Sequence, residues 1–135
     1  MRIFIVFLLT VFLIACRAAP STPISPSPTL SAEPPGEISV AVFRDLNRNG
    51  ARDANEPGVA DQVGLAPDTD CTIGDPAVIL PAETDPATGE YTYTDLAPGL
   101  YCVMYRGAQP LTTEPAYTLT LASGERSEVA FGLAP

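Results

Sequence analysis

The strongest constraint on the fold comes from residues 45–56, which place oxygen-bearing side chains at regular intervals around a glycine. This stretch matches D-x-[DN]-x-[DN]-G-x5-E at every defined position, which is the spacing of a twelve-residue calcium loop. Oxygens at alternate positions can converge as the chain curls, and Gly50 allows the sharp turn. The predicted ligands are side-chain oxygens and one backbone carbonyl, from Asp45, Asn47, Asn49, Ala51 (carbonyl), Asp53 and Glu56. An all-oxygen set favours Ca²⁺ over Zn²⁺. The alternative is a polar Asn/Gly turn that needs no metal.

The flanks of loop 45–56 indicate a β-sheet rather than a pair of helices. Residues 38–43 alternate apolar and small or polar side chains with the period of a strand. Pro57 and Gly58 follow the loop directly and would stop a helix that left it. We therefore expect a calcium loop that connects strands, not a helix-loop-helix sensor.

Charge and composition exclude several classes of function. The chain has 135 residues, a formal net charge of −9 and no histidine, and all seven of its Lys and Arg residues are arginine. An acidic, lysine-free surface repels phosphate backbones, so we expect no binding of nucleic acid. The absence of histidine excludes Ser-His-Asp and Cys-His catalysis and His-ligated zinc. Without lysine, Schiff-base chemistry and Lys–Asn isopeptide bonds are excluded too. We therefore expect that the protein is not an enzyme.

The N-terminus has the features of an exported, lipid-anchored protein. Arg2 precedes an apolar run from Ile3 to Ala15 that is too short to span a bilayer but suits a signal peptide. The run ends in Leu-Ile-Ala-Cys, which resembles a bacterial lipobox. It predicts that residues 1–15 are removed and that Cys16 carries lipid. The alternative is an ordinary secretory signal with an incidental cysteine.

The residues after Cys16 predict a stalk followed by one folded domain. Residues 17–36 are rich in Pro, Ser and Thr, a composition that forms no core. The prolines hold the chain near polyproline II. At about 3.1 Å per residue, the stalk could hold a domain up to roughly 60 Å from a membrane. The predicted divisions are a leader at 1–15, a lipidated cysteine with linker at 16–36 and a domain at 37–135.

The domain is predicted to be an all-β, antiparallel sandwich of the Greek-key type. Short alternating segments separated by turn residues are typical of such folds, and no helical periodicity is present. The expected strands are 38–43, 63–65, 78–80, 90–94, 100–106, 117–121 and 127–131. The last two are expected to form a hairpin through the turn at 123–125.

These segments resemble the serine-aspartate-repeat B-type (SdrD B-like) domains of bacterial surface proteins, relatives of collagen-adhesin B and prealbumin-like modules. The matching segments are residues 42–59, 89–93, 96–103, 123–125 and 129–133. The resemblance implies a calcium-stabilised sandwich that acts as a rigid spacer or presenting module without catalysis. It also implies that the residues named above hold the ion. Family members often occur in tandem arrays on wall-anchored proteins, whereas this sequence has a single module and a predicted lipid anchor.

The two remaining cysteines, Cys71 and Cys102, are predicted to form a disulfide. Outside the cytosol, two cysteines in a small domain are more often bridged than free. Cys102 alternates with Tyr101 and Val103, so it faces outward if those two point into the core. It could then tie down the loop at residues 66–77. Two free thiols are the alternative.

Other polar and aromatic residues are assigned structural roles. The tyrosines at strand positions are better explained by packing than by a sugar-binding platform; they are Tyr91, Tyr93, Tyr101, Tyr105 and Tyr117. The acidic loop residues are better explained as turn formers than as a second ion site; they are Asp68, Asp70, Asp75 and Asp85.

The sequence therefore predicts a cell-surface lipoprotein whose calcium-stabilised sandwich is a structural or adhesive spacer, extracellular or periplasmic. Its partners would be the membrane, through the lipid on Cys16, and an extracellular protein or glycan. The alternative function is a module that binds carbohydrate or protein through loops at one end of the sandwich.

Overall fold

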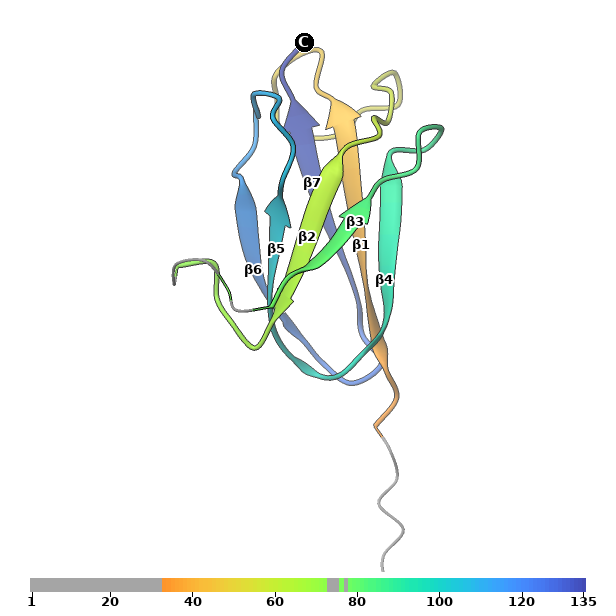
Figure 1. Ribbon diagram of the computed structural model, residues 1–135. Coiled ribbons are helices and arrows are strands. Elements are labelled where there is room, and N and C mark those ends of the chain that lie inside the picture. The colour runs from red at the N-terminus through yellow and green to blue at the C-terminus, as the bar shows by residue number, and fades with distance from the viewer. Residues whose placement is uncertain (1–32, 73–75, 77) are drawn as a thin grey trace, which may run out of the picture. The chain divides into compact units, whose positions relative to one another are not determined.

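The computed structural model describes residues 33–72, 76 and 78–135, all within the compact unit Ser31–Pro135. This part of the chain forms seven strands and contains no helix (Figure 1). The strands are β1 (Gly36–Arg44), β2 (Gln62–Pro67), β3 (Leu80–Glu83), β4 (Glu90–Leu96), β5 (Gly99–Tyr105), β6 (Ala116–Leu121) and β7 (Arg126–Leu133). None of the described residues belongs to a helix that could cross a membrane. The predicted leader, Cys16 and most of the predicted linker lie outside the described residues.

The strands form two sheets that face each other, which confirms the predicted β-sandwich (Figure 1). One sheet has the order β4-β1-β7 and the other the order β3-β2-β5-β6. The ladders are antiparallel except between β1 and β7, which pair in parallel from Glu37 opposite Arg126 onwards. The expectation of a wholly antiparallel sandwich is therefore wrong at this one ladder among the described strands.

The predicted hairpin between the last two strands is also wrong. β6 pairs with β5 and β7 pairs with β1, so the turn at 122–125 carries the chain from one sheet to the other. Gly124 has a φ of 69°, and the Glu125 carboxylate accepts a hydrogen bond from the Ala122 N–H at 2.6 Å. A tight turn between sheets uses the same residues as a hairpin, so local sequence does not distinguish the two.

Each observed strand begins or ends one to three residues away from its predicted range, and two of these differences have a clear cause. β3 begins at Leu80 instead of residue 78, and the Val78 side chain is exposed. β3 is an edge strand, where Pro81 can stand opposite Gly64 without breaking a ladder on its outer side. β1 begins at Gly36, one residue before the predicted start of the domain, because Gly36 is buried and paired with Leu96.

The core lies between the sheets and follows the predicted alternation. β1 contributes Ile38, Val40 and Val42, which are fully buried, while Ser39 and Ala41 lie on the other face. The opposite sheet and the strands β4 and β7 complete the core with Val63, Leu65, Tyr93, Leu96, Tyr101, Val103, Leu121, Val129, Phe131 and Leu133. This single apolar layer explains why strands with weak individual signals fold together.

The tyrosines are mainly packing residues, as predicted. Tyr93 and Tyr101 are buried, and their hydroxyls donate to the Leu80 and Ala97 carbonyls at 3.0 and 2.7 Å. Burial raises the pKa of Tyr93 to about 12, so its hydroxyl stays a donor. Tyr91 is the exception because its ring is 40% exposed and stands edge-on to Tyr93.

The predicted disulfide is confirmed: Cys71 and Cys102 are bonded, with their Cα atoms 5.1 Å apart. The Cys71 N–H also donates to the Thr118 hydroxyl on β6 at 3.1 Å. Cys102 is only 3% exposed although the core residues Tyr101 and Val103 flank it in the strand. The segment that carries Cys71 is thus fastened to the outer face of the β5–β6 ladder.

Candidate metal centre

Loop 45–56 leaves the end of β1 and is closed by the carboxylate of Glu56. The Leu46 N–H donates to Glu56 Oε1 at 2.8 Å, and the Asp53 N–H donates to Oε2 at 3.0 Å. Glu56 is only 4% exposed. The carboxylate of the last predicted ligand therefore links the backbone at the start of the loop, at Leu46, to the backbone near its end, at Asp53.

Asp45, the first predicted ligand, is fully buried. Its Oδ1 accepts from the Asn49 N–H at 3.1 Å and its Oδ2 from the Gly50 N–H at 2.9 Å. Burial raises the pKa of the Asp45 carboxyl, but hydrogen bonds from the Thr112 hydroxyl and nearby backbone N–H groups outweigh burial. The pKa therefore lies below its usual value. The carboxylate is held in its charged form at the base of the loop.

The three side-chain ligands predicted between Asp45 and Glu56 meet on the exposed side of the loop. The amide nitrogens of Asn47 and Asn49 both donate to Asp53 Oδ2, at 2.7 and 3.1 Å. The amide oxygen of Asn47 accepts from the Asn49 N–H and that of Asn49 from the Ala51 N–H. The structure thus brings these side chains together in the order that the motif predicts, in contact with one another and with the backbone.

The loop carries buried negative charge that forms no ion pair with the arginines in the described part of the chain. Among the described residues, the ion pairs are Arg52 with Glu90 at 2.8 Å and Arg126 with Glu37. Neither buried carboxylate of the loop takes part in one. Buried charges in proteins are usually paired or bound to metal, so the oxygen donor set fits a hard cation such as Ca²⁺.

The fit depends on amide and carbonyl oxygens as well as carboxylates. No group of three or more His, Cys, Asp or Glu side chains within the described ranges is placed to hold a metal.

Of the acidic residues considered for a second ion site, Asp85 accepts from the Ala87 and Thr88 N–H groups at 2.8 and 3.0 Å. This is the turn-forming role expected for it, and Asp75 lies outside the described residues.

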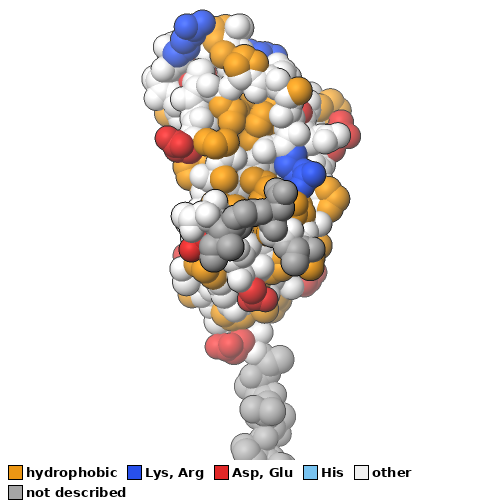
Figure 2. All heavy atoms as spheres, turned by 60° about the vertical axis from the view of Figure 1, so that its left-hand side comes forward, with side chains coloured by type: hydrophobic (Ala, Val, Ile, Leu, Met, Phe, Trp, Pro, Cys, Tyr) orange, Lys and Arg blue, Asp and Glu red, His pale blue; other side chains and the backbone are white. Residues whose placement is uncertain are grey.

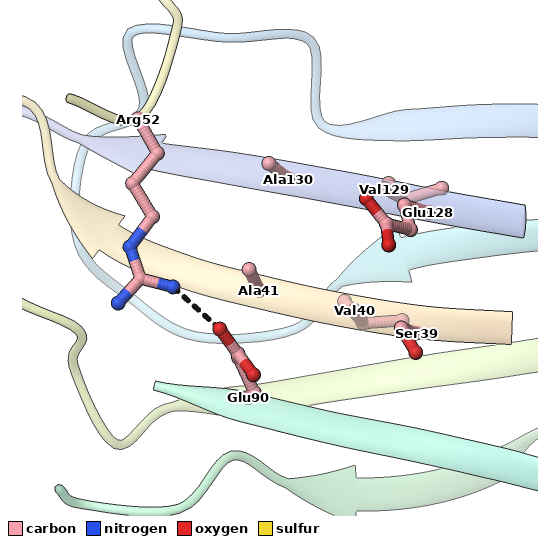
Figure 3. Close-up of a pocket in the computed structure, with 8 residues that line it drawn as sticks. All are labelled: Ser39, Val40, Ala41, Arg52, Glu90, Glu128, Val129 and Ala130. Atoms are coloured by element: carbon pink, nitrogen blue, oxygen red, sulfur yellow. Dashed lines mark hydrogen bonds and ion pairs between the residues drawn. The ribbon is translucent and has the colours of Figure 1, made fainter. Parts of the chain in front are cut away.

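The Arg52 side chain extends toward Glu90 over the outer face of the β4-β1-β7 sheet (Figure 3). Its guanidinium donates to Glu90 Oε1 and to the Thr88 carbonyl, each at 2.8 Å. It forms one end of a shallow cavity of about 370 Å³ whose floor includes the small residues Ser39, Ala41 and Ala130. Arg52, one of the two arginines in the loop, thus pairs with Glu90 and not with the buried carboxylates.

Thr112 contacts the loop and was not among the predicted site residues. Its hydroxyl donates to Asp45 Oδ2 from a position 67 residues further along the chain. A local motif carries no signal for such a partner, since the β5–β6 connection reaches the loop only in the folded sandwich. Figure 2 shows one face of the molecule, on which acidic and apolar side chains lie in several separate areas.

Comparison with known proteins places this architecture in a family. Bone sialoprotein-binding protein of Staphylococcus aureus (strain MRSA252) is 36% identical over 90 residues, which cover 66% of this chain and 7% of that protein. Serine-aspartate repeat-containing protein E of Staphylococcus aureus (strain MSSA476) gives the same values. The chain therefore corresponds to a small part, 7%, of the length of these relatives.

A solved structure supports the fold alone. The full-length major pilin SpaD from Corynebacterium diphtheriae superimposes with a TM-score of 0.52 at 11% identity, over 73% of this chain and 32% of the pilin.

Residues 36–127 match the profile of the SdrD B-like domain, and this span contains loop 45–56 and all of β1 to β6. The chain belongs to the SdrD B-like domain family.

Proposed function

We propose that this protein is a surface-displayed structural module, a spacer or presenting domain, whose sandwich is braced by Ca²⁺ in loop 45–56. The observation that carries the proposal is the burial of Asp45 and Glu56 without a cationic partner among the described residues. With Asp53, these carboxylates repel one another, and a bound divalent cation would supply the missing positive charge. The proposed ligands are Asp45, Asn47, Asn49, Ala51 (carbonyl), Asp53 and Glu56.

The position of the loop supports a bracing role. Asp45 donates its N–H to the Leu133 carbonyl at the end of β7, at 3.0 Å. On the other side of the loop, the Arg44 N–H donates to the Pro57 carbonyl at 2.9 Å. Rigidity in the loop is therefore passed to β1, the central strand of one sheet, and to β7 beside it, a useful property in a spacer. The residues around the loop hold position and exclude water, and no catalytic step is proposed for them.

Display outside the cytosol is supported by the family, by the disulfide and by the predicted leader. Disulfides persist in oxidising compartments. We propose that Cys16 anchors the protein to a bacterial membrane through lipid and that the proline-rich stalk holds the sandwich away from it. An extracellular protein or glycan is the proposed partner class for a presented module, in keeping with the relative named for binding bone sialoprotein.

Calcium is expected to stabilise the unit Ser31–Pro135, with a dissociation constant on the order of 10⁻⁶–10⁻⁴ M. At a hundredfold excess over that constant, the free energy of unfolding should rise by about 2.7 kcal/mol. This corresponds to a melting shift of at least several degrees. Glu56→Gln should remove most of the shift, whereas Asn55→Ala, an exposed neighbour, should retain it. The measurement is thermal melting in EDTA, in millimolar Ca²⁺ and in Mg²⁺. Identical melting in all three would show that the loop is only a turn.

Cys16→Ser is expected to release the protein from membranes or to block removal of its leader. The sulfur that would receive the lipid is lost, while Ser21→Ala in the stalk keeps it and serves as the control. Membrane fractionation with N-terminal sequencing of the mature protein gives the result. A Cys16→Ser protein that is cleaved normally and stays in the membrane fraction would disprove the lipid anchor.

A further inference from the structure

The connection between β5 and β6, residues 106–115, reaches loop 45–56 through a hydrogen bond from Thr112. The Thr112 hydroxyl donates to Oδ2 of Asp45, the same oxygen that accepts from the Gly50 N–H. Asp45 is fully buried, so this hydroxyl replaces water as a hydrogen-bond donor to the carboxylate. A charge-assisted hydrogen bond of this kind is stronger and shorter than one between neutral groups.

Residues on β7 fix the position of Thr112 independently of the loop. The Thr112 N–H donates to the Gly132 carbonyl at 2.8 Å, and the Gly132 N–H donates to the Thr113 hydroxyl at 3.2 Å. A Cβ at residue 132 would lie 2.5 Å from Thr112 Oγ1 and 3.2 Å from the Asp45 Cβ. Only glycine at this position lets the hydroxyl and the carboxylate meet.

The same connection is anchored a second time near its start. Gln109 accepts from the Arg44 guanidinium at 2.9 Å and donates its side-chain amide to Asp61 at 3.1 Å. Its backbone N–H donates to the Tyr105 hydroxyl at 3.2 Å. The segment that carries the Thr112 hydroxyl is therefore held at two places. A donor held in a fixed position can in turn fix the orientation of the Asp45 carboxylate.

We propose that Thr112 is a positioning residue for calcium binding: it fixes the rotamer of Asp45 so that the carboxylate faces the interior of loop 45–56. The proposal rests on the calcium site proposed above and adds a determinant from outside the motif. Hydrogen-bond partners of ligating carboxylates typically change metal affinity by about 10- to 100-fold when removed. By linkage, calcium in the loop must in turn stabilise the contact between residue 112 and Asp45.

The test is calorimetric titration of the full chain in detergent with Ca²⁺, comparing single variants. Thr112→Val keeps the shape of the side chain but removes the hydroxyl, and should weaken binding by about 10-fold or more. Thr112→Ser restores the hydroxyl and should bind nearly as tightly as the unaltered chain. Thr94→Val is the matched control, since its hydroxyl donates to Asp95, a carboxylate outside the loop.

Hydrogen exchange of the unaltered chain gives a second readout that needs no variant. Calcium should slow exchange at the Thr112 and Gly132 amides, because the ion and the hydroxyl hold the same carboxylate. If the unaltered chain takes up no calcium, the calcium site and the role of Thr112 are both wrong. If it binds calcium but Thr112→Val binds as tightly as Thr94→Val, or more tightly, only the role of Thr112 is wrong. Should Thr112→Val not fold, unchanged exchange at these two amides on adding calcium would overturn the role by itself.

Discussion

Loss of the Cys71–Cys102 disulfide is expected to lower the free energy of unfolding by about 3–4 kcal/mol. The two cysteines are 31 residues apart, and a cross-link over that span removes many conformations from the unfolded chain. The bond also fastens the segment at Cys71 over the outer face of β5, where Cys102 is almost fully buried. For a domain of this size, the melting temperature should fall by at least ten degrees.

The measurement is denaturant unfolding of the Cys71→Ser/Cys102→Ser double variant, beside the unaltered chain with and without reductant. The reduced chain and the double variant should unfold at similar denaturant concentrations, because both lack only the cross-link. Alkylation without reductant, followed by mass spectrometry, should modify neither cysteine of the unaltered chain. A double variant as stable as the oxidised chain would mean that the bond constrains little that the sheets do not already hold.

The parts of the fold that sequence predicted are those set by neighbouring residues. Ile38, Val40 and Val42 point into the core because strand side chains alternate, and the alternation is visible in the sequence. The same rule placed Cys102 on the face opposite Tyr101 and Val103, where the disulfide is found. The twelve residues of the loop could likewise be recognised because all of its predicted ligands lie within one continuous segment of the sequence.

The parts that sequence missed depend on which distant segments become neighbours. Ser123, Gly124 and Glu125 form a tight turn, but whether the chain returns to the same sheet depends on where β1 and β5 already lie. The parallel pairing of β7 with β1 follows from that choice. Thr112 reaches Asp45 for the same reason, as residues 106–115 pass over the end of β7 only once both sheets are assembled.

Gly89, directly before β4, packs closely against the segment that follows loop 45–56. Gly89 has a φ of 71°, and its carbonyl accepts from the Val42 N–H at 2.7 Å. A Cβ there would lie 2.3 Å from the Val42 carbonyl oxygen and 2.5 Å from the Cα of Gly58. These are backbone atoms in a hydrogen-bonded sheet, so they cannot move aside as the end of a flexible side chain can.

Gly89→Ala is therefore expected to lower the free energy of unfolding by about 2–5 kcal/mol. A left-handed backbone costs a residue with a Cβ about 1–2 kcal/mol, and overpacking adds about 1–3 kcal/mol. Gly124→Ala separates the two effects, because Gly124 has a φ of 69° but its Cβ would come no closer than 3.4 Å to Pro34. That control should lose only the backbone part. Denaturant unfolding of both variants in EDTA keeps calcium out of the comparison, since the clash at Gly89 is between backbone segments. Equal losses in the two variants would show that the sheet yields at Val42. A larger loss at Gly89 would show that close backbone packing holds the exit of loop 45–56 against β4 before any ion binds.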